Sequence, residues 1–130
     1  MGSSSSKTVD MLVNKTYPVS VKCVPTGGKP VKHCPANGGH CVTVDPEKST
    51  VQTITIPNLQ KAKSITICES GYRGGCRTIP KDRWGSYGIS GDSITLGGSC
   101  NYVTCTNTNN GGSCYNRGDT LPYSVTVNYK

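Results

Sequence analysis

Eight cysteines in a chain of 130 residues constrain the fold more than any other feature of this sequence. Apolar residues make up 33% of the chain, Phe is absent and Trp occurs once, so the hydrophobic core must be small. Disulfides are the usual supplement to a small core, and an even number of cysteines fits complete pairing. A reducing compartment would break such bridges, so we predict a secreted, extracellular protein. The candidate disulfide cysteines are Cys23, Cys34, Cys41, Cys68, Cys76, Cys100, Cys105 and Cys114.

Two segments of the chain share one pattern, SITICESGYRGGCRTI (64–79) and NYVTCTNTNNGGSCYN (101–116). Each has a β-rich run ending in Cys, a polar loop, a Gly-Gly pair and a second Cys. Cys68 and Cys76 are equidistant from Tyr72, so a hairpin centred there places them on facing strands. Facing Cα atoms lie about 4.5–5.5 Å apart, which a disulfide can span. We therefore predict at least one bridge within a repeat, with bridges between repeats, such as Cys76 to Cys100, as the alternative.

The apolar residues occur mostly as short alternating runs of Val, Ile and Tyr between Gly, Pro and Asn turns, which predicts an all-β sandwich or barrel. A looser third copy of the repeat is expected between Cys23 and Cys34, and a short helical turn between Pro80 and Trp84. We expect a flexible segment over 1–16 and a single disulfide-rich β domain over 17–130. The start of the chain lacks the apolar region of a signal peptide, so we expect a mature form. The predicted strands lie near 18–24, 40–44, 51–56, 64–69, 75–79, 93–96, 101–106, 113–116 and 123–129.

The repeat resembles the Greek-key motif of the βγ-crystallin family over residues 63–130. ITICESGYRGGCRTI followed by WGSYGISGDSITL resembles one motif, and NYVTCTNTNNGGSC followed by GDTLPYSVTV an abbreviated second one. Gly75 and Gly112 match the family's hairpin glycine, where a side chain would clash, while Cys68 and Cys105 replace its aromatic residue. The family includes lens proteins, calcium binders and secreted members similar to killer toxins, antifungal proteins and a metalloproteinase inhibitor, and the cysteines favour the secreted branch.

The resemblance implies a Greek-key β-sandwich, stapled by disulfides, in which the two copies pack against each other. The core candidates are Ile65, Ile67, Ile79, Ile94, Leu96, Val103, Val125 and Val127.

We predict no metal, no cofactor and no catalytic residues. His33-Cys34 and His40-Cys41 could offer zinc ligands, but oxidised cysteines cannot bind zinc. The segment 91–96, which stands where the family carries a calcium loop, keeps a single acid, too few oxygen ligands for tight binding. Both histidines fall in one Gly-rich loop and the acids are scattered, so no acid–base pair is evident and we predict a non-enzyme. Asn14, in the sequon Asn14-Lys15-Thr16, is a candidate glycosylation site.

Basic and aromatic residues crowd into one stretch of this chain, whose formal charge is +7. Tyr, Trp and Arg dominate binding hot spots, so the stretch is a candidate binding surface. The alternative is that Trp84 and Tyr87 fill the core. The candidate binding residues are Tyr72, Arg73, Arg77, Arg83, Trp84 and Tyr87.

From these features we expect a non-enzymatic binding protein that acts as a toxin, an antimicrobial protein or a host-directed effector. The expected partner is a target-cell surface component or a host or competitor protein. Anionic glycan or lipid are further candidates, nucleic acid is disfavoured, and we expect a monomer. One alternative is a protease inhibitor presenting a disulfide-stiffened loop, 107–112 or 71–74. Another is a glycan-binding module that uses Tyr and Trp faces.

Overall fold

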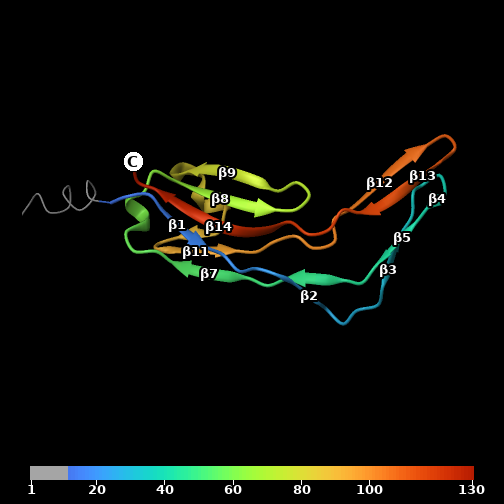
Figure 1. Cartoon of the computed structure of the whole chain (residues 1–130), viewed down its shortest axis with the longest axis horizontal. Helices are drawn as coiled ribbons and strands as arrows, with labels where there is room; N and C mark the ends of the chain where they lie inside the picture. Colours follow the sequence, from blue (N-terminus) through green and yellow to red (C-terminus); the bar gives the residue numbers. More distant parts are fainter. Residues whose placement is uncertain (1–11) are drawn as a thin grey trace, which may run out of the picture.

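The computed structural model describes residues 12–130, which form an all-β protein with four disulfides (Figure 1). Several of the longer strands alternate between buried and more exposed residues, and glycines or prolines lie at or beside many of the strand ends. The elements are β1 (Lys15–Pro18), β2 (Cys23–Pro25), β3 (Val31–His33), β4 (Gly39–His40), β5 (Val42–Val44), β6 (Glu47–Ser49), β7 (Gln52–Thr55), η1 (Leu59–Lys61), β8 (Ser64–Ser70), β9 (Gly75–Pro80), η2 (Lys81–Ser86), β10 (Ile89–Ser90), β11 (Ser93–Leu96), β12 (Val103–Thr108), β13 (Gly111–Asn116) and β14 (Leu121–Asn128).

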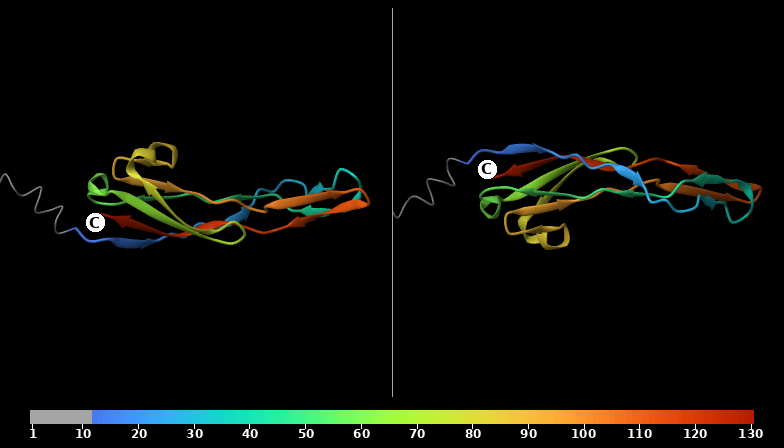
Figure 2. Two further views of the ribbon diagram at one scale, coloured as in Figure 1. Left: turned by 90° about the horizontal axis from the view of Figure 1, so that it is seen from above. Right: turned by 90° about the horizontal axis from the view of Figure 1, so that it is seen from below.

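The molecule is elongated and has two parts, as Figures 1 and 2 show. We call residues 12–22, 50–98 and 119–130 the body, and residues 23–49 and 99–118 the arm. The chain leaves the body for the arm twice and returns twice. The four crossing segments, 19–22, 49–51, 97–102 and 117–120, form what we call the waist. The arm is thus two separate excursions of the chain rather than one continuous segment.

The body is a sandwich of two antiparallel sheets. One sheet has the order β1-β14-β8-β9 and the other has the order β10-β11-β7. The inward residues of both sheets belong to one hydrophobic cluster, in which Ile65, Ile94, Val125 and Val127 are fully buried. Outward residues are polar, and Thr66 and Thr78 join their hydroxyl groups across β8 and β9 at 2.9 Å. This period-two alternation is the pattern from which the strands are predicted.

The arm consists of small sheets with little buried apolar surface. They have the orders β12-β13-β4, β2-β6 and β3-β5. Among the arm residues, Pro35, Val44 and Cys114 are buried, yet none of them belongs to the cluster in the body. Backbone contact partly replaces side-chain packing, because a Cβ at Gly112 would lie 1.9 Å from the carbonyl oxygen of Thr106. The arm therefore depends on covalent cross-links more than the body does.

Three disulfides close hairpins or short loops, and one joins distant segments. Cys68–Cys76 and Cys105–Cys114 link directly opposed residues, each with Cα atoms 4.0 Å apart, and Cys34–Cys41 closes a loop in the arm. Cys23–Cys100 spans 77 positions and ties the two excursions of the arm together at their base. The prediction that at least one bridge lies within a repeat is confirmed, because both repeats contain one, and the alternative bridge from Cys76 to Cys100 is not formed.

The structure also tests the predicted fold class, core residues and strand boundaries. The all-β class and the core candidates are confirmed, except that Val103 is only half-buried and lies outside the cluster. The predicted helical turn is η2. The expected segment 18–24 is two strands, β1 and β2, because the chain passes from body to arm between them. The strands β3, β6 and β10, which have two or three residues each, were not predicted.

The two copies of the repeat do not pack against each other as expected. The hairpin β8–β9 lies in the body, whereas β12–β13 lies in the arm (Figure 1). The predicted third copy does not form a hairpin, because β2 pairs with β6 and β3 pairs with β5. The resemblance implies that a side chain at the hairpin glycine would clash with its surroundings. This holds at Gly112, but a Cβ at Gly75 would meet no atom within 4 Å. The Greek-key arrangement of the crystallin family stays a prediction.

The C-terminal boundary of the expected flexible segment, residues 1–16, is wrong. Lys15 and Thr16 pair with Val127 and Thr126 in β14, so they belong to the body. The Oδ1 atom of Asn14 accepts a hydrogen bond from the backbone N–H of Tyr129 at 2.8 Å. Residues 1–11 lie outside the described part of the chain.

Loss of the long-range disulfide should destabilise the protein more than loss of a hairpin disulfide. In the chain-entropy model, a loop of 77 positions corresponds to about 4.5 kcal/mol and a loop of 8 positions to about 2.5 kcal/mol. We expect the C23S/C100S protein to unfold at a lower guanidinium concentration than the C68S/C76S protein, measured without reductant. The opposite order would contradict the cross-linking role assigned to Cys23–Cys100.

The phenol of Tyr129 is a buried group that links stability to alkaline pH. Tyr129 is buried in the core cluster, and its hydroxyl donates to the carbonyl oxygen of Pro57 at 3.2 Å. Burial raises its pKa above the ordinary value of 10.0, and the charges of Tyr17 and Asp92 raise the pKa further. The folded state therefore holds this proton more tightly than the unfolded state. Its contribution to stability is complete below the unfolded pKa and is lost as pH rises through the raised folded pKa.

Replacing Tyr129 with Phe should reveal this linkage. Below pH about 10 we expect Tyr129→Phe to unfold about 1 kcal/mol more easily, because a hydrogen bond is lost. Above that pH, the wild-type protein loses stability that the variant does not lose, so the difference should shrink. Urea unfolding curves of both proteins measured from neutral to strongly alkaline pH provide the comparison. Parallel stability profiles over the whole range would refute the linkage.

Candidate functional site

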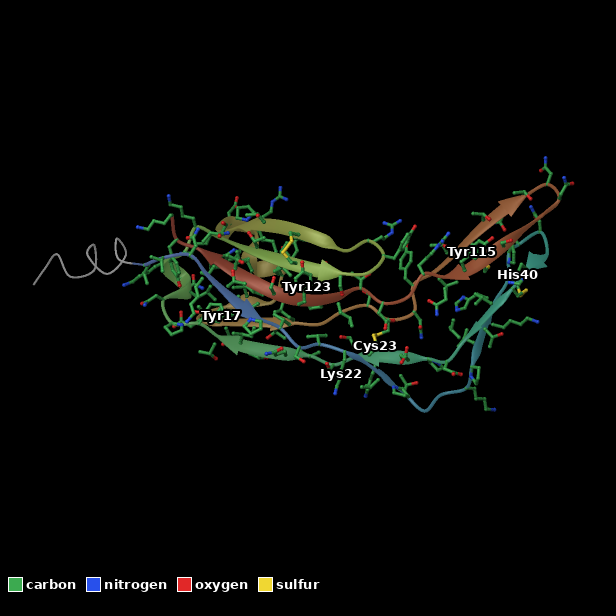
Figure 3. The ribbon with its side chains drawn as sticks, in the orientation of Figure 1. Tyr17, Lys22, Cys23, His40, Tyr115 and Tyr123 are labelled. Carbon is green, nitrogen blue, oxygen red and sulfur yellow. A yellow bond between two sulfur atoms is a disulfide. The ribbon has the colours of Figure 1, made fainter. Side chains whose placement is uncertain are left out.

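Five exposed side chains form a continuous stack where the body meets the arm. They come from three places: the loop between β8 and β9, the crossing segment before β12, and β13 with the segment that follows it. Figure 3 labels Tyr115 at the arm side of this region. We call this set the Tyr–Arg stack, and its members are Tyr72, Arg73, Tyr102, Tyr115 and Arg117.

Each member of the stack contacts the next. The guanidinium of Arg73 lies 5.2 Å from the ring centroid of Tyr102, whose ring lies 5.7 Å from that of Tyr72 at an angle of 41°. The guanidinium of Arg117 lies 5.4 Å from the ring of Tyr72 and 4.9 Å from that of Tyr115. Arginine over an aromatic face is an attractive arrangement, so these contacts hold the side chains in place. The stack therefore runs Arg73, Tyr102, Tyr72, Arg117, Tyr115.

The backbone beneath the stack is also fixed. Gly71 has a φ of +93°, and a Cβ there would lie 1.8 Å from the carbonyl oxygen of Asp119, so only glycine lets the loop approach the waist this closely. The hydroxyl of Thr120 donates to the carbonyl of Tyr72. The backbone N–H of Tyr102 donates to Gly118 at 2.8 Å, which pairs the two crossing segments. The loop and the base of the arm thus present their side chains in a set arrangement.

The stack is exposed and carries two unpaired positive charges. The relative exposures of Tyr72, Tyr102 and Tyr115 are 43%, 36% and 46%. Within residues 12–130, the ion pair found is Arg77–Glu69, so neither arginine of the stack has a carboxylate partner. Arg117 donates through Nε to the hydroxyl of Thr104 at 2.9 Å, which leaves its other N–H groups available. The surface can therefore offer aromatic contact and donors for an anion at once.

The binding surface predicted from sequence is divided between different places. Tyr72 and Arg73 belong to the stack. Trp84 is only 4% exposed, and its Nε1–H donates to the carbonyl of Ile79 at 3.0 Å. It fills the core, as the alternative interpretation holds, and it cannot form an exposed surface. Arg83 lies in η2, away from the waist (Figure 2).

Arg77 and Tyr87 line a second region, a cleft of about 230 Å³ on the body. The guanidinium of Arg77 pairs there with the carboxylate of Glu69 at 3.1 Å. No histidine lines this cleft, because His33 and His40 belong to β3 and β4 in the arm. The described geometry therefore places Glu69 opposite an arginine but gives it no histidine as a second proton-transfer group.

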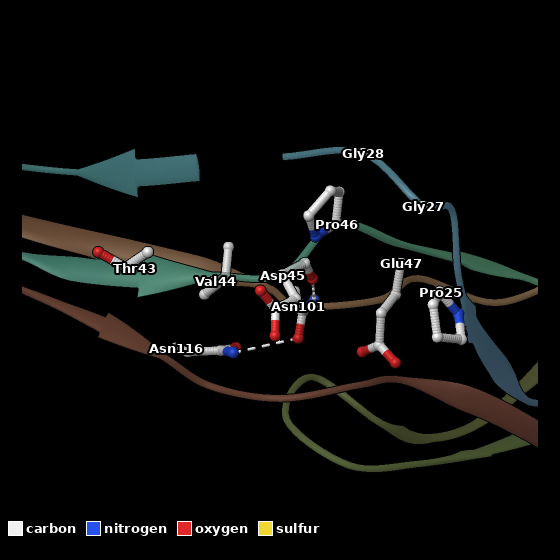
Figure 4. Close-up of a pocket in the computed structure, with 10 residues that line it drawn as sticks. All are labelled: Pro25, Gly27, Gly28, Thr43, Val44, Asp45, Pro46, Glu47, Asn101 and Asn116. Carbon is white, nitrogen blue, oxygen red and sulfur yellow. Dashed lines mark hydrogen bonds between the residues drawn. The ribbon is translucent and has the colours of Figure 1, made fainter. Parts of the chain in front are cut away.

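A larger cleft of about 500 Å³ lies at the base of the arm. Figure 4 shows the residues that line it. Asn101 has a φ of 53°, and its side chain donates to the carbonyl of Asp45 at 2.8 Å and accepts from Asn116 at 3.1 Å. Asparagine tolerates this left-handed conformation better than most residues do. These hydrogen bonds hold the crossing segment against the arm, so the polar groups of the Asn101 side chain have a structural role. The cleft includes none of the five stack residues.

The structure places the residues that the sequence analysis considered as metal ligands. Cys34 and Cys41 form a disulfide, so they offer no thiolates for zinc. Among the described residues, one cluster has ligand-like spacing, Cys23, Cys100 and Asp119, but its two sulfur atoms are bonded to each other. The acid of the segment 91–96, Asp92, is exposed.

The two candidate inhibitor loops are shorter and more engaged than the sequence suggests. The ladder of β12 and β13 continues to the pair Thr108 and Gly111, which leaves a two-residue turn. Asn107 accepts from the backbone N–H of Ala36 at 2.7 Å. The loop 71–74 is closed by a hydrogen bond of 2.9 Å from Gly74 to Gly71, and its side chains belong to the stack. Neither loop offers the extended free segment that a protease cleft accepts.

No known protein family, curated protein or solved structure matches this chain. No helix among the described residues is long and apolar enough to cross a membrane.

Three members of the stack, Tyr102, Tyr115 and Arg117, were not predicted. A local signal exists, because the hairpin that carries Cys105 and Cys114 pairs Val103 with Asn116. The next pair outward brings Tyr102 opposite Arg117, two residues from Tyr115. The sequence carries no signal that the loop of the other hairpin reaches this point.

Proposed function

We propose that this protein is a secreted, non-catalytic binding protein that acts as a toxin, antimicrobial protein or host-directed effector. The observation that carries the proposal is the Tyr–Arg stack, a fixed and exposed set of the residue types that dominate binding hot spots. Secretion is supported by the four disulfides, because such bridges persist in oxidising compartments. The resemblance to secreted βγ-crystallin-like proteins points the same way.

A purely structural role for the stack is the main competing interpretation. The stack does join the loop of β8 and β9 to the base of the arm, so it contributes to the rigidity of the waist. A brace of this kind is expected to bury its rings, whereas these three tyrosines have relative exposures of 36–46%. The arginines of a brace are also expected to meet acids, and these do not. Exposure and unpaired charge therefore favour a binding role in addition to the structural one.

The rigidity of the Tyr–Arg stack supports a binding role. A surface whose side chains are already ordered loses little conformational entropy when a partner binds. The cleft that contains Glu69 lacks a histidine, and the candidate inhibitor loops are engaged with the rest of the protein.

Binding of labelled protein to intact fungal, bacterial and plant cells tests the proposal. We expect saturable binding to at least one of these cell types, and at least tenfold weaker binding for Y115A/R117A, because hot-spot truncations typically cost 2 kcal/mol or more. The matched control is Y123A/K61A, which removes an exposed tyrosine of the body and a cation of η1. Tyr123 lies on the body in Figure 3.

Two results would count against the proposal. Equal binding by Y115A/R117A and wild type would remove the stack as the contact surface. Absence of binding to every cell type would remove the binding function, and normal growth of all cells in its presence would remove the toxin and antimicrobial roles. The melting temperature of each variant, measured in parallel, separates lost contacts from lost folding.

A further inference from the structure

The openness of the Tyr–Arg stack indicates the shape of its ligand. Neither of the two described clefts includes a stack residue, and all three rings are exposed. Small-molecule sites are concave and surround most of their ligand. An open row of side chains that runs from body to arm instead suits an extended chain that contacts several of them in turn.

The charges of the stack indicate an anionic ligand. Arg73 and Arg117 lack carboxylate partners within residues 12–130. The side chain of Arg73 makes no hydrogen bond to these residues and contacts the ring of Tyr102. A guanidinium presents a planar fork of N–H donors that matches a carboxylate bidentately. Two such forks, separated by the rings of Tyr72 and Tyr102, fit a polymer that carries carboxylates at intervals.

The rings of the stack favour sugars over nucleobases. Bases are usually bound by stacking on open, parallel aromatic faces. Here the rings of Tyr72 and Tyr102 are tilted by 41° with centroids 5.7 Å apart, and guanidiniums lie against all three rings. No flat slot remains between them. The hydroxyls of the three tyrosines form no hydrogen bond within the described chain, so they are available to the hydroxyl groups of a sugar.

We propose that the Tyr–Arg stack binds a polyuronate, an acidic polysaccharide whose sugars carry carboxylates. This inference rests on the proposed function and names the partner class of the same site. Arg73 and Arg117 pair with carboxylates on separate sugars, while the hydroxyls of Tyr72, Tyr102 and Tyr115 form hydrogen bonds with the sugars along the chain. A secreted protein meets such polymers outside cells.

Calorimetric titration of the full chain with polygalacturonate tests this inference. We expect binding that weakens as the salt concentration rises, and no binding to neutral dextran. R73Q should bind about tenfold more weakly and R73Q/R117Q about a hundredfold more weakly, the loss of one and two charge-assisted contacts. R117K, which keeps the charge but loses the fork, should be weaker than wild type and stronger than R117Q.

A matched control separates a site from general attraction of charge. K61Q/K63Q removes two cations at the far end of the body, where η1 leads into β8 (Figure 1), and we expect its affinity to stay within about twofold of wild type. R73Q is the cleanest variant for a folding check, because the Arg73 side chain has no hydrogen bond to lose within the described residues. Its melting temperature should match that of wild type.

Several outcomes would overturn the inference. These are absence of binding to polygalacturonate, unchanged affinity in R73Q/R117Q, an equal loss in K61Q/K63Q, or tighter binding to dextran sulfate or to oligothymidylate. The cell-binding assay reads the proposed function independently. A protein that binds cells through the stack but ignores polygalacturonate loses the ligand class alone, whereas one that binds polygalacturonate but no cell loses the proposed role alone.

Discussion

The cross-link between Cys23 and Cys100 is the constraint on which the rest of the structure depends. The arm is built from two excursions of the chain that lack a shared hydrophobic cluster, and this bridge joins them at their base across 77 positions. Cys34–Cys41 and Cys105–Cys114 then stiffen the individual loops of the arm. The body can rely on apolar packing around Ile65 and Val125. Disulfides thus replace, in the arm, the core that the composition cannot supply.

The position of the Tyr–Arg stack follows from this architecture. Because the chain crosses the waist four times, outgoing and returning segments lie side by side there, and Tyr102 and Arg117 come from one such pair. The close approach of Gly71 to Asp119 brings the loop of the body hairpin onto the same point. A feature that stabilises the junction is therefore also an exposed aromatic and cationic surface. The fold and the proposed function depend on the same residues. The melting temperature of each variant is therefore needed to separate a loss of binding from a loss of folding.

Local patterns in the sequence predict much of the fold. Alternation predicts β8, β9, β11 and β14, and symmetric spacing about Tyr72 predicts the Cys68–Cys76 bridge, because each depends on residues close together in the chain. The Cys23–Cys100 bridge and the separation of the two repeats depend on long-range pairing, for which spacing gives no signal. Trp84 shows a second limit of prediction from sequence. A single tryptophan beside basic residues can be buried in the core or exposed on the surface, and the local sequence does not distinguish the two. The Tyr–Arg stack depends both on long-range pairing and on which aromatic residues are exposed. For this reason only Tyr72 and Arg73 among its members were predicted.

The disulfide connectivity of the native protein tests this account most directly. Digestion without reductant, followed by mass spectrometry of the linked peptides, identifies each bridge. The account predicts Cys23–Cys100, Cys34–Cys41, Cys68–Cys76 and Cys105–Cys114, with no free thiol. Any other partner for Cys23 or Cys100, or a free thiol at either position, would contradict the cross-linked arm and with it the arrangement of the waist.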